Sequence, residues 1–383
     1  MNLPSASTTP QPTASEAAHV IVERRGCAGL ITLNRPKALN ALSLPMVRAL
    51  TEALNAFRAD PSVLLVAIRG SNKVGQPGTA AALFGGFCAG GDIRFFHQAA
   101  LAGDSALDDF FTEEYRLNHL IHNFGKPVVA FMDGVVMGGG MGLCQGASLR
   151  VVTEHSKLAM PETNIGLFPD VGGGYFLSRC PGHVGEYLAL TGEIISAQDA
   201  VQWGLADVEI EAVSQAAHWQ ALGEQAFANA AEVQPWLDQQ FGRQAVSLAV
   251  EPHIDAVFSL LRVKHMIDAL EKDKDKRWAQ KTAKVLRKRS PLMLHVTLEQ
   301  IRRARGMSLA DDLRMERDMV HHCFNLRPGA ASETVEGIRA LAVDKDYAPQ
   351  WSPARIEDVK PGMADVFFVS PWAADVHPLR ILS

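Results

Sequence analysis

The feature that most constrains this chain is a repeated order of short apolar runs and amphipathic helices in its first half. Residues 63–68, 127–132 and 148–153 are rich in apolar side chains and have the length of buried strands. Residues 45–58 and 107–123 carry apolar side chains at helical spacing. Because strands that alternate with helices pack as a sheet covered by those helices, the first half predicts an α/β core.

The second half has a different pattern, since strand-like runs become rare after about residue 207. Helical spacing predominates from there on, and residues 308–324 predict one of these helices. Residues 1–18 are rich in Ser, Thr, Pro and Ala and predict a disordered tail. We therefore divide the chain into this tail, an α/β core over residues 19–210, and a mostly helical C-terminal region over residues 211–383.

Composition and charge exclude several classes of protein. Of the 383 residues, 47% are hydrophobic and 21% are charged, which is the balance of a globular protein. The net charge of −5 argues against a nucleic-acid or anionic-membrane surface. No apolar run reaches the roughly 18 residues of a membrane span. Five scattered cysteines form no disulfide framework, and the first residues lack the features of a secretory signal. We therefore expect a cytoplasmic protein.

Motifs for nucleotides, metals and a nucleophilic serine are absent from the sequence. The glycine clusters lack the G-x-G-x-x-G spacing, and neither a P-loop nor a G-x-S-x-G elbow occurs. Two histidine pairs, His119 with His122 and His321 with His322, have no further ligands at zinc spacing. We therefore predict no metal and no redox cofactor.

Two glycine-rich segments each precede a predicted helix. Residues 87–93 have the sequence FCAGGDI, and residues 133–142 have the sequence DGVVMGGGMG. Glycine lets a ligand approach the main chain closely, and free amides at a helix start favour negative charge. Two such amides directed at one oxygen would form an oxyanion hole. The alternative is that the glycines only make tight turns and close packing.

Several motifs, in one order along the chain, resemble those of the enoyl-CoA hydratase/isomerase (crotonase) family. They are LNRPKALN at residues 33–40, FCAGGD at 87–92, GGG at 138–140, PE at 161–162, TG at 191–192 and SP at 290–291. The resemblance implies a spiral of ββα units that takes acyl-CoA as its substrate, so that CoA is no separate cofactor. It also implies that the amides of Ala89 and Gly139 polarise the thioester carbonyl. It leaves a homo-oligomer open.

The acid–base residues narrow the chemistry within this family. Its hydratases carry one glutamate just after the glycine run and another in the Pro-Glu motif. Here Gly142 stands at the first position, whereas Glu162 keeps the second, and Asp170 is a new acid where hydratases usually have glycine. Since the addition of water to a double bond needs an acid and a base, the lost glutamate makes hydration the weaker interpretation.

The chain further resembles one branch of the family, the 3-hydroxyisobutyryl-CoA hydrolases. The similar segments are residues 160–177, the run Glu113-Glu114-Tyr115, and motifs between residues 336 and 353 in a C-terminal extension that hydratases lack. Residues 325–332 look longer than the corresponding hydrolase segment.

This second resemblance implies hydrolysis of 3-hydroxyisobutyryl-CoA to 3-hydroxyisobutyrate and CoA, a step of valine degradation. Glu162 and Asp170 would be catalytic, while Glu114, Gly139, Glu162 and Asp170 would bind the substrate. The enzymatic alternative is an enoyl-CoA hydratase or isomerase that uses Glu162 alone. The non-enzymatic alternative is a scaffold or RNA-binding protein of the same fold, although the net charge argues against RNA.

Two of these acids can also be interpreted from local patterns. On a helix, Glu114 falls within the apolar stripe of Phe110, Leu117 and Ile121, where a carboxylate needs a partner or a function. Asp170 lies just before a glycine-rich helix that it could cap instead. The basic residues between 281 and 289 form either a CoA phosphate contact or a solvated helix face.

Overall fold

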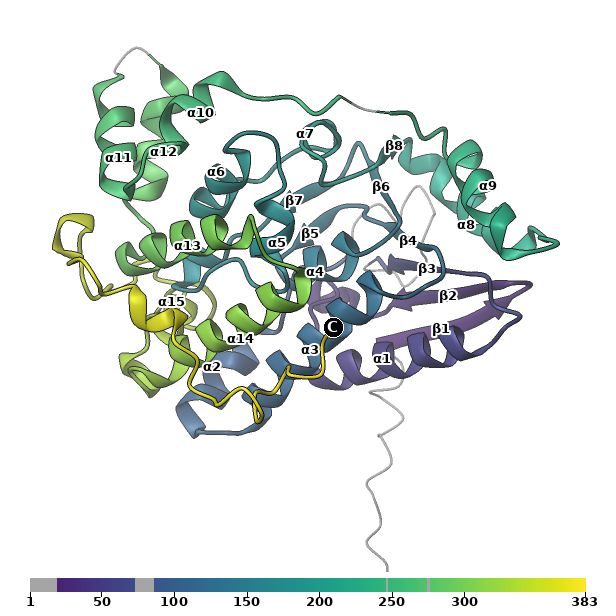
Figure 1. Ribbon diagram of the computed structural model, residues 1–383, viewed down its shortest axis with the longest axis horizontal. Coiled ribbons are helices and arrows are strands. Elements are labelled where there is room, and N and C mark those ends of the chain that lie inside the picture. Colours follow the sequence, from purple (N-terminus) through teal and green to yellow (C-terminus); the bar gives the residue numbers. More distant parts are fainter. Residues whose placement is uncertain (1–18, 73–85, 246, 274–275) are drawn as a thin grey trace, which may run out of the picture.

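The computed structural model describes residues 19–383 except for residues 73–85, 246 and 274–275 (Figure 1). The predicted disordered tail, residues 1–18, lies outside the described residues. The strands are β1 (Val20–Arg25), β2 (Ala28–Leu33), β3 (Leu65–Gly70), β4 (Val128–Phe131), β5 (Val135–Met137), β6 (Leu149–Thr153), β7 (Lys157–Ala159) and β8 (Val208–Ile210).

The helices cover both halves of the chain. They are α1 (Leu44–Ala59), α2 (Ile93–Ala102), α3 (Ala106–His122), α4 (Gly139–Gln145), α5 (Gly173–Leu177), α6 (Val184–Thr191), α7 (Ala197–Gln202), α8 (Gln215–Glu224), α9 (Val233–Gln240), α10 (Pro252–Phe258), α11 (Val263–Lys272), α12 (Arg277–Leu286), α13 (Pro291–Ala304), α14 (Leu309–Asn325) and α15 (Glu333–Ile338). Within the described part of the chain, none of them is long and apolar enough to cross a membrane.

The main sheet has six strands in the order β1-β2-β3-β4-β6-β8, and a second sheet pairs β5 with β7. β1 and β2 pair as an antiparallel hairpin, and the remaining neighbours are parallel. Two successive steps of the chain, β4 with β5 and then β6 with β7, each add one strand to the main sheet and one to the small sheet before a helical turn follows. This order confirms the predicted α/β fold built from ββα units.

The two faces of the main sheet bury different sets of side chains, because successive residues of a strand point to opposite faces. Leu30 and Val129 pack toward α8 and α9, where Trp219 is buried. Their neighbours Ile31 and Val128 belong to the larger core on the other face. The sheet is therefore covered on both faces, as a parallel sheet requires.

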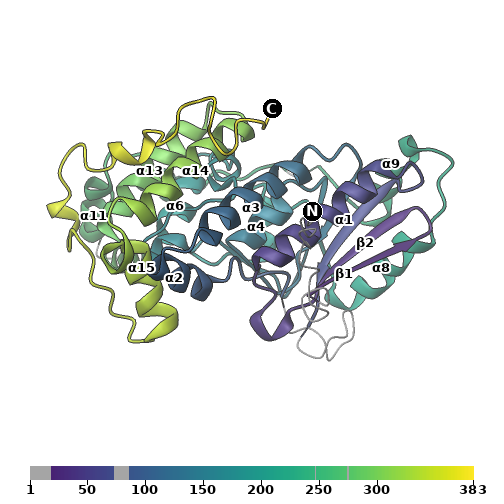
Figure 2. The same ribbon diagram turned by 90° about the horizontal axis from the view of Figure 1, so that it is seen from below.

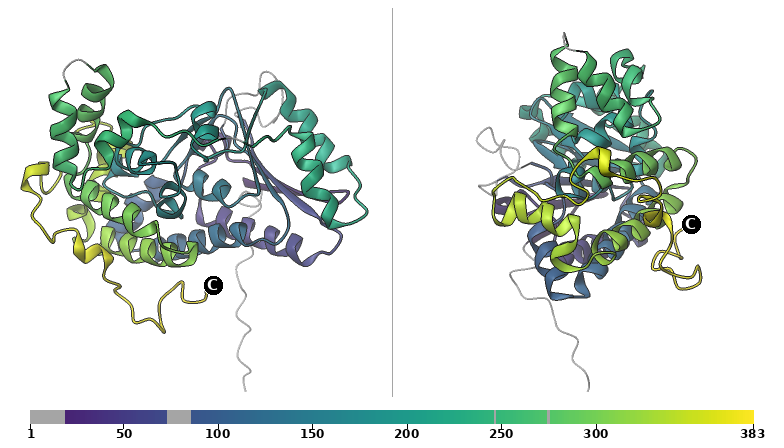
Figure 3. Two further views of the ribbon diagram at one scale, coloured as in Figure 1. Left: turned by 45° about the horizontal axis from the view of Figure 1, so that its top comes forward. Right: turned by 90° about the vertical axis from the view of Figure 1, so that its left-hand side faces the viewer.

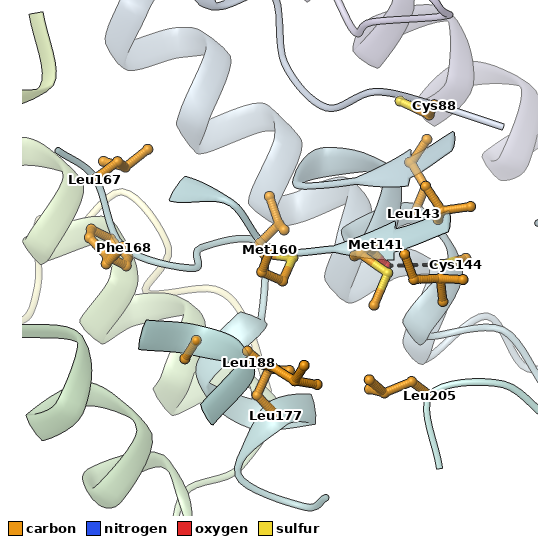
Figure 4. Close-up of a cluster of buried hydrophobic side chains, with 14 of the residues drawn as sticks. Cys88, Met141, Leu143, Cys144, Met160, Leu167, Phe168, Leu177, Leu188 and Leu205 are labelled. Carbon is orange, nitrogen blue, oxygen red and sulfur yellow. Dashed lines mark hydrogen bonds between the residues drawn. The ribbon is translucent and has the colours of Figure 1, made fainter. Parts of the chain in front are cut away.

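The larger core surrounds α4, the short helix that begins at Gly139. Figure 4 shows Met141, Leu143 and Cys144 of this helix among buried side chains such as Met160 and Leu188. The Cys144 thiol donates to the carbonyl of Met141 at 3.3 Å, which ties the sulfur to its own helix. Packing on several sides holds the glycine-rich start of α4 in place.

The main sheet and the C-terminal helices lie at opposite ends of the molecule. In two views, β1, β2 and α8 lie at one end and α11, α13 and α15 at the other (Figures 1 and 2). The last segment, in yellow, runs along the outside of the helical end (Figure 3). One buried core nonetheless extends from Val20 to Leu379. The predicted boundary between residues 210 and 211 stays a prediction.

Candidate active site

All five residues predicted for the site line a single cavity of about 230 Å³. Ala89 lies in the loop before α2, and Glu114 lies in the middle of α3. Gly139 is the first residue of α4, and Glu162 is the first residue of the 3-10 turn η4 (Glu162–Ile165). Asp170 lies in the loop between η4 and α5. Residues far apart in the sequence thus meet at one place.

Two glycines at the start of α4 make room for two of the carboxylates. A Cβ atom on Gly139 would lie 2.5 Å from Oε1 of Glu114, and one on Gly138 would lie 2.7 Å from Oε1 of Glu162. Gly138 also has a φ of 50°, a backbone conformation that other residues rarely adopt. Only glycine at both positions lets the acids lie against the main chain.

The three acids are almost fully buried, with 2% of Glu114, 6% of Glu162 and 5% of Asp170 exposed. Among the described residues, Oε1 of Glu114 and Oε2 of Glu162 have no hydrogen-bond partner. Oδ2 of Asp170 accepts a hydrogen bond from the hydroxyl of Tyr115 at 2.9 Å. Buried polar atoms normally have partners, so these orphaned oxygens indicate that a bound molecule supplies them.

Burial raises the pKa values of all three acids. The pKa of Glu114 lies well above its ordinary value because of burial and the charges of Asp170 and Glu162. Burial and the charge of Asp170 raise the pKa of Glu162 in the same way. Burial raises the pKa of Asp170 to about 7, although the hydrogen bond from Tyr115 acts in the opposite direction. All three acids are therefore harder to ionise than free carboxyl groups, and the pKa of Asp170, about 7, suits acid–base work near neutral pH.

The structure corrects one of the two predicted oxyanion donors. The amide of Ala89 donates to the carbonyl of Leu39 at 3.0 Å, so it does not point into the cavity. The amide of Leu42 donates to the carbonyl of Gly90, and the amide of Asp92 donates to that of Leu42.

These two bonds leave the backbone amide of Gly91 pointing away from Leu42, because successive amides point in opposite directions along an extended segment. Neither the amide of Gly91 nor that of Gly139 has an acceptor among the described residues. A Cβ on Gly139 would lie 3.5 Å from the carbonyl carbon of Gly90, so the two segments touch. Gly91 and Gly139 are the better pair of donors.

The alternative role of Asp170 as a helix cap is wrong. α5 begins at Gly173, and no side chain of its first turn or of Asp170 caps it. Glu316 of α14 accepts from the amides of Gly172 at 2.7 Å and Gly174 at 2.9 Å instead. The side chain of Asp170 is therefore free to face the cavity.

Glu316 belongs to a buried group that supports the Asp170 loop from behind. The side-chain Nε2 of Gln300 donates to Oε1 of Glu316 at 3.0 Å and to the carbonyl of Pro169 at 2.6 Å. Asp312, one turn before Glu316, accepts from the amide of Tyr175 at 2.9 Å. Glu316, Gln300 and Asp312 were not predicted from the sequence. The signal was there, because both acids lie at helical spacing within the apolar stripe of α14, as Glu114 does in α3.

The position that carries a second glutamate in hydratases has no space for a side chain. A Cβ on Gly142 would lie 2.6 Å from Cβ of Val171 and 2.9 Å from Nδ2 of Asn118. Val171 is buried and has a φ of 57°, which is rare for a β-branched residue. Val171 therefore fills the volume that a glutamate at position 142 would need.

The basic residues of the C-terminal half have varied surroundings. Arg289 donates to the carbonyl of Thr191 and to the side chain of Asn164, which lines the cavity. Lys281 pairs with Glu193, and Arg287 pairs with Glu271. Contact with CoA phosphates stays a prediction for this group.

The segment that looked longer than in the hydrolases makes an ordinary connection between two helices. It includes a 3-10 turn over Gly329–Ala331, and Ser332 then caps α15 by accepting from the amide of Val335. The hydroxyl of Ser332 donates to the carbonyl of Cys323 at 2.7 Å, which anchors the connection to the end of α14.

Comparison with known proteins identifies the family. The sequence profile described as "Enoyl-CoA hydratase/isomerase" matches residues 28–368. The chain belongs to the enoyl-CoA hydratase/isomerase family. Within it, the chain resembles "3-hydroxyisobutyryl-CoA hydrolase, mitochondrial" of Rattus norvegicus, with 39% identity over 94% of this chain and 91% of that protein. The protein of the same name from Gallus gallus is 37% identical over 92% of this chain and 89% of its own length.

Two solved structures of the enoyl-CoA hydratase/isomerase family have the same fold over most of their length. A carnitinyl-CoA dehydratase from Mycobacterium thermoresistibile has a TM-score of 0.77 and 36% identity, over 92% of this chain and 96% of its own. An enoyl-CoA hydratase from Rhodobacter sphaeroides 2.4.1 has a TM-score of 0.76 and 34% identity, over 92% and 98%. The chain is an acyl-CoA enzyme of this family.

The crowding at Gly142 predicts a coupled effect on stability. Gly142→Ala should lower the free energy of unfolding by about 1–3 kcal/mol, the usual cost of overpacking. Val171→Gly in the same chain should recover part of this loss, because it removes the atom in contact and relieves a positive φ. Urea unfolding of both single variants and the double variant measures the coupling. Strictly additive losses would show that Val171 does not fill this space.

The support from α14 predicts a second loss of stability. Glu316→Gln places an NH₂ group where an oxygen accepts from a backbone amide, and should cost about 1–3 kcal/mol. Thermal unfolding together with kcat would report both stability and the placement of Asp170. The matched control is Glu299→Gln on the exposed face of α13, where only a surface ion pair is lost. Equal effects of Glu316→Gln and Glu299→Gln would show that Glu316 does not support the Asp170 loop.

Proposed function

We propose that this enzyme hydrolyses the thioester of short 3-hydroxyacyl-CoA substrates, with 3-hydroxyisobutyryl-CoA as the first candidate. The observation that carries the proposal is the pair of buried carboxylate oxygens on Glu114 and Glu162 that find no partner in the described part of the chain, next to glycine amides without an acceptor there, in one cavity. The names of the relatives from Rattus norvegicus and Gallus gallus support the choice of substrate. With that substrate, the reaction belongs to valine degradation and needs no additional cofactor.

In the proposed reaction, the thioester oxygen accepts hydrogen bonds from the amides of Gly91 and Gly139. These donors stabilise the negative charge that develops on this oxygen in the transition state. The carboxylate of Glu162 then follows one of two routes. It attacks the carbonyl carbon, which gives a mixed anhydride and the thiol of CoA before water completes the hydrolysis, or it takes a proton from an attacking water.

The other two acids suit the hydroxyl group of the substrate. Glu114 has a free oxygen against Gly139, so it is placed to accept a hydrogen bond from a substrate close to the oxyanion amides. Asp170, with a pKa of about 7, can accept or release a proton at neutral pH. Tyr115 donates to Asp170 and fixes its orientation.

Hydration is disfavoured, although two solved structures similar to this chain are named as a dehydratase and a hydratase. A second glutamate after the glycine run is replaced by Gly142, and Val171 fills the adjacent volume. Without a second catalytic glutamate at that position, Glu162 suits acyl transfer to water better than hydration.

The first test is the release of free thiol from a panel of acyl-CoA esters. The wild type should release CoA from 3-hydroxyisobutyryl-CoA faster than it consumes the double bond of crotonyl-CoA. Glu162→Gln should lower kcat by at least about 10²-fold, because it removes a positioned base or nucleophile while keeping its shape. Glu113→Gln is the matched control, since Glu113 neighbours Glu114 but forms an ion pair with Arg48 on the surface.

Three results would reject this proposal. They are absence of thiol release from every 3-hydroxyacyl-CoA, loss of the crotonyl-CoA double bond at a rate above that of thiol release from any 3-hydroxyacyl-CoA, and near wild-type turnover by Glu162→Gln.

The raised pKa of Glu162 predicts how activity depends on pH. Glu162 acts as a carboxylate, so kcat should fall as the pH falls through its raised pKa. Asp170→Asn removes a negative charge that raises the pKa of Glu162, so the acid limb of kcat should shift to lower pH. Profiles from about pH 5 to 9 for the wild type and this variant measure the shift. An acid limb that stays in place, or moves to higher pH, would contradict the coupling between Asp170 and Glu162.

A further inference from the structure

The C-terminal extension reaches the active-site cavity through one side chain, that of Leu341. After α15 the chain forms a single turn of π-helix, η8 (Arg339–Val343). Leu341 lies on this turn, is partly buried, and lines the cavity together with Glu114 and Glu162. Among the described residues that line the cavity, Leu341 alone comes from the chain beyond Val171. Single π-helical turns occur often at functional sites.

A network of charges around Arg339 holds this turn in place. The guanidinium of Arg339 contacts Glu336 at 2.8 Å, and Asp344 and Asp346 at 2.7 Å each. The amide of Gln350 donates to Glu336 at 2.7 Å, which links the following segment to the same network. One arginine thus ties together the residues on both sides of Leu341. The side chain of Leu341 therefore comes from a turn that these ion pairs hold in place.

The wall near Leu341 is apolar. α15 and η8 both pack against α2, which begins two residues after Gly91. The cavity is lined there by Ile93 and Phe96 of α2, by Phe111 of α3 and by Leu167. These side chains cannot recognise a hydroxyl group through hydrogen bonds. They limit size and shape, while Glu114 and Asp170 supply the polar contacts.

We propose that Leu341 is a specificity-determining residue that limits the length of the acyl group. The inference rests on the proposed function, because it takes the cavity to be the site of an acyl-CoA thioester. With the thioester oxygen at Gly91 and Gly139, the acyl chain extends between α2 and the π-helical turn. Each methylene beyond a short chain must displace Leu341 or the rings opposite it.

The experiment compares two substrates that differ by two methylenes, 3-hydroxybutyryl-CoA and 3-hydroxyhexanoyl-CoA. Leu341→Ala should raise the ratio of kcat/KM for the longer over the shorter substrate by at least about tenfold, the usual effect of a methylene in an apolar pocket. Leu341→Phe should lower this ratio, and Leu341→Met should keep it within a few-fold, since Met has a similar volume. Val343→Ala is the control, because Val343 is exposed on the same turn.

Two results would overturn the role of Leu341 while leaving hydrolysis intact. An unchanged ratio in both the Ala and the Phe variant would show that the acyl chain does not reach this residue. An equal loss for both substrates would show that Leu341 contacts a part that all CoA esters share. The opposite directions expected for Ala and Phe keep the test decisive when one variant folds poorly.

A wild type without any thiol release would reject the proposed function rather than this inference. In that case, affinities measured calorimetrically test the role of Leu341. Butyryl-CoA and hexanoyl-CoA are each titrated into the wild type and into Leu341→Ala. The variant should favour hexanoyl-CoA by at least about tenfold relative to the wild type. Equal affinities would reject the role of Leu341 independently of catalysis.

Discussion

The site depends on the close approach of two carboxylates to a stretch of main chain that has no side chains. Glu114 and Glu162 occupy the space that Cβ atoms on Gly139 and Gly138 would fill. Burying acids without partners costs free energy, and this cost is typical of sites in which a ligand completes the hydrogen bonds. The same stretch of main chain exposes the amide of Gly139, which has no acceptor among the described residues. One backbone feature thus brings an acid and an oxyanion donor within reach of the same bound group.

The second half of the chain supports this arrangement, because it holds the loop of Asp170 in place and lines part of the cavity. Glu316 and Gln300 hold the loop that carries Asp170, and Arg289 holds Asn164. The extension adds Leu341 to the wall of the cavity. These contacts explain why one core extends through both halves of the sequence. A helical region that first looks like an addition to the α/β core completes its active site.

Local patterns were sufficient to predict the fold class, whereas most acids of the site were predicted from the family resemblance. The helices α1, α3 and α14 lie where apolar spacing places them, because these patterns depend on residues a few positions apart. The burial of Glu114 followed from helical spacing alone. Asp170 and Glu162 were singled out by family motifs, and the structure brings both to the same cavity.

The features that could not be predicted depend on contacts between distant segments. The family resemblance pointed to Ala89, and the sequence does not show that Leu42 pairs with this loop and turns alternate amides in opposite directions. Asp170 could be taken for a cap of α5 because Glu316, which accepts from the amides of Gly172 and Gly174, lies more than 140 residues away. The place of Leu341 depends on how a π-helical turn packs against α2.

A crystal structure of Glu162→Gln with 3-hydroxyisobutyryl-CoA bound would show directly whether the acids and the glycine amides meet at one substrate group. We expect the thioester oxygen to lie within about 2.7–3.1 Å of the amides of both Gly91 and Gly139. We also expect the side chain of residue 162 to lie beside the carbonyl carbon, with the hydroxyl of the substrate at Glu114 or Asp170. A thioester oxygen that faces solvent, or one bound away from both glycine amides, would rule out this arrangement.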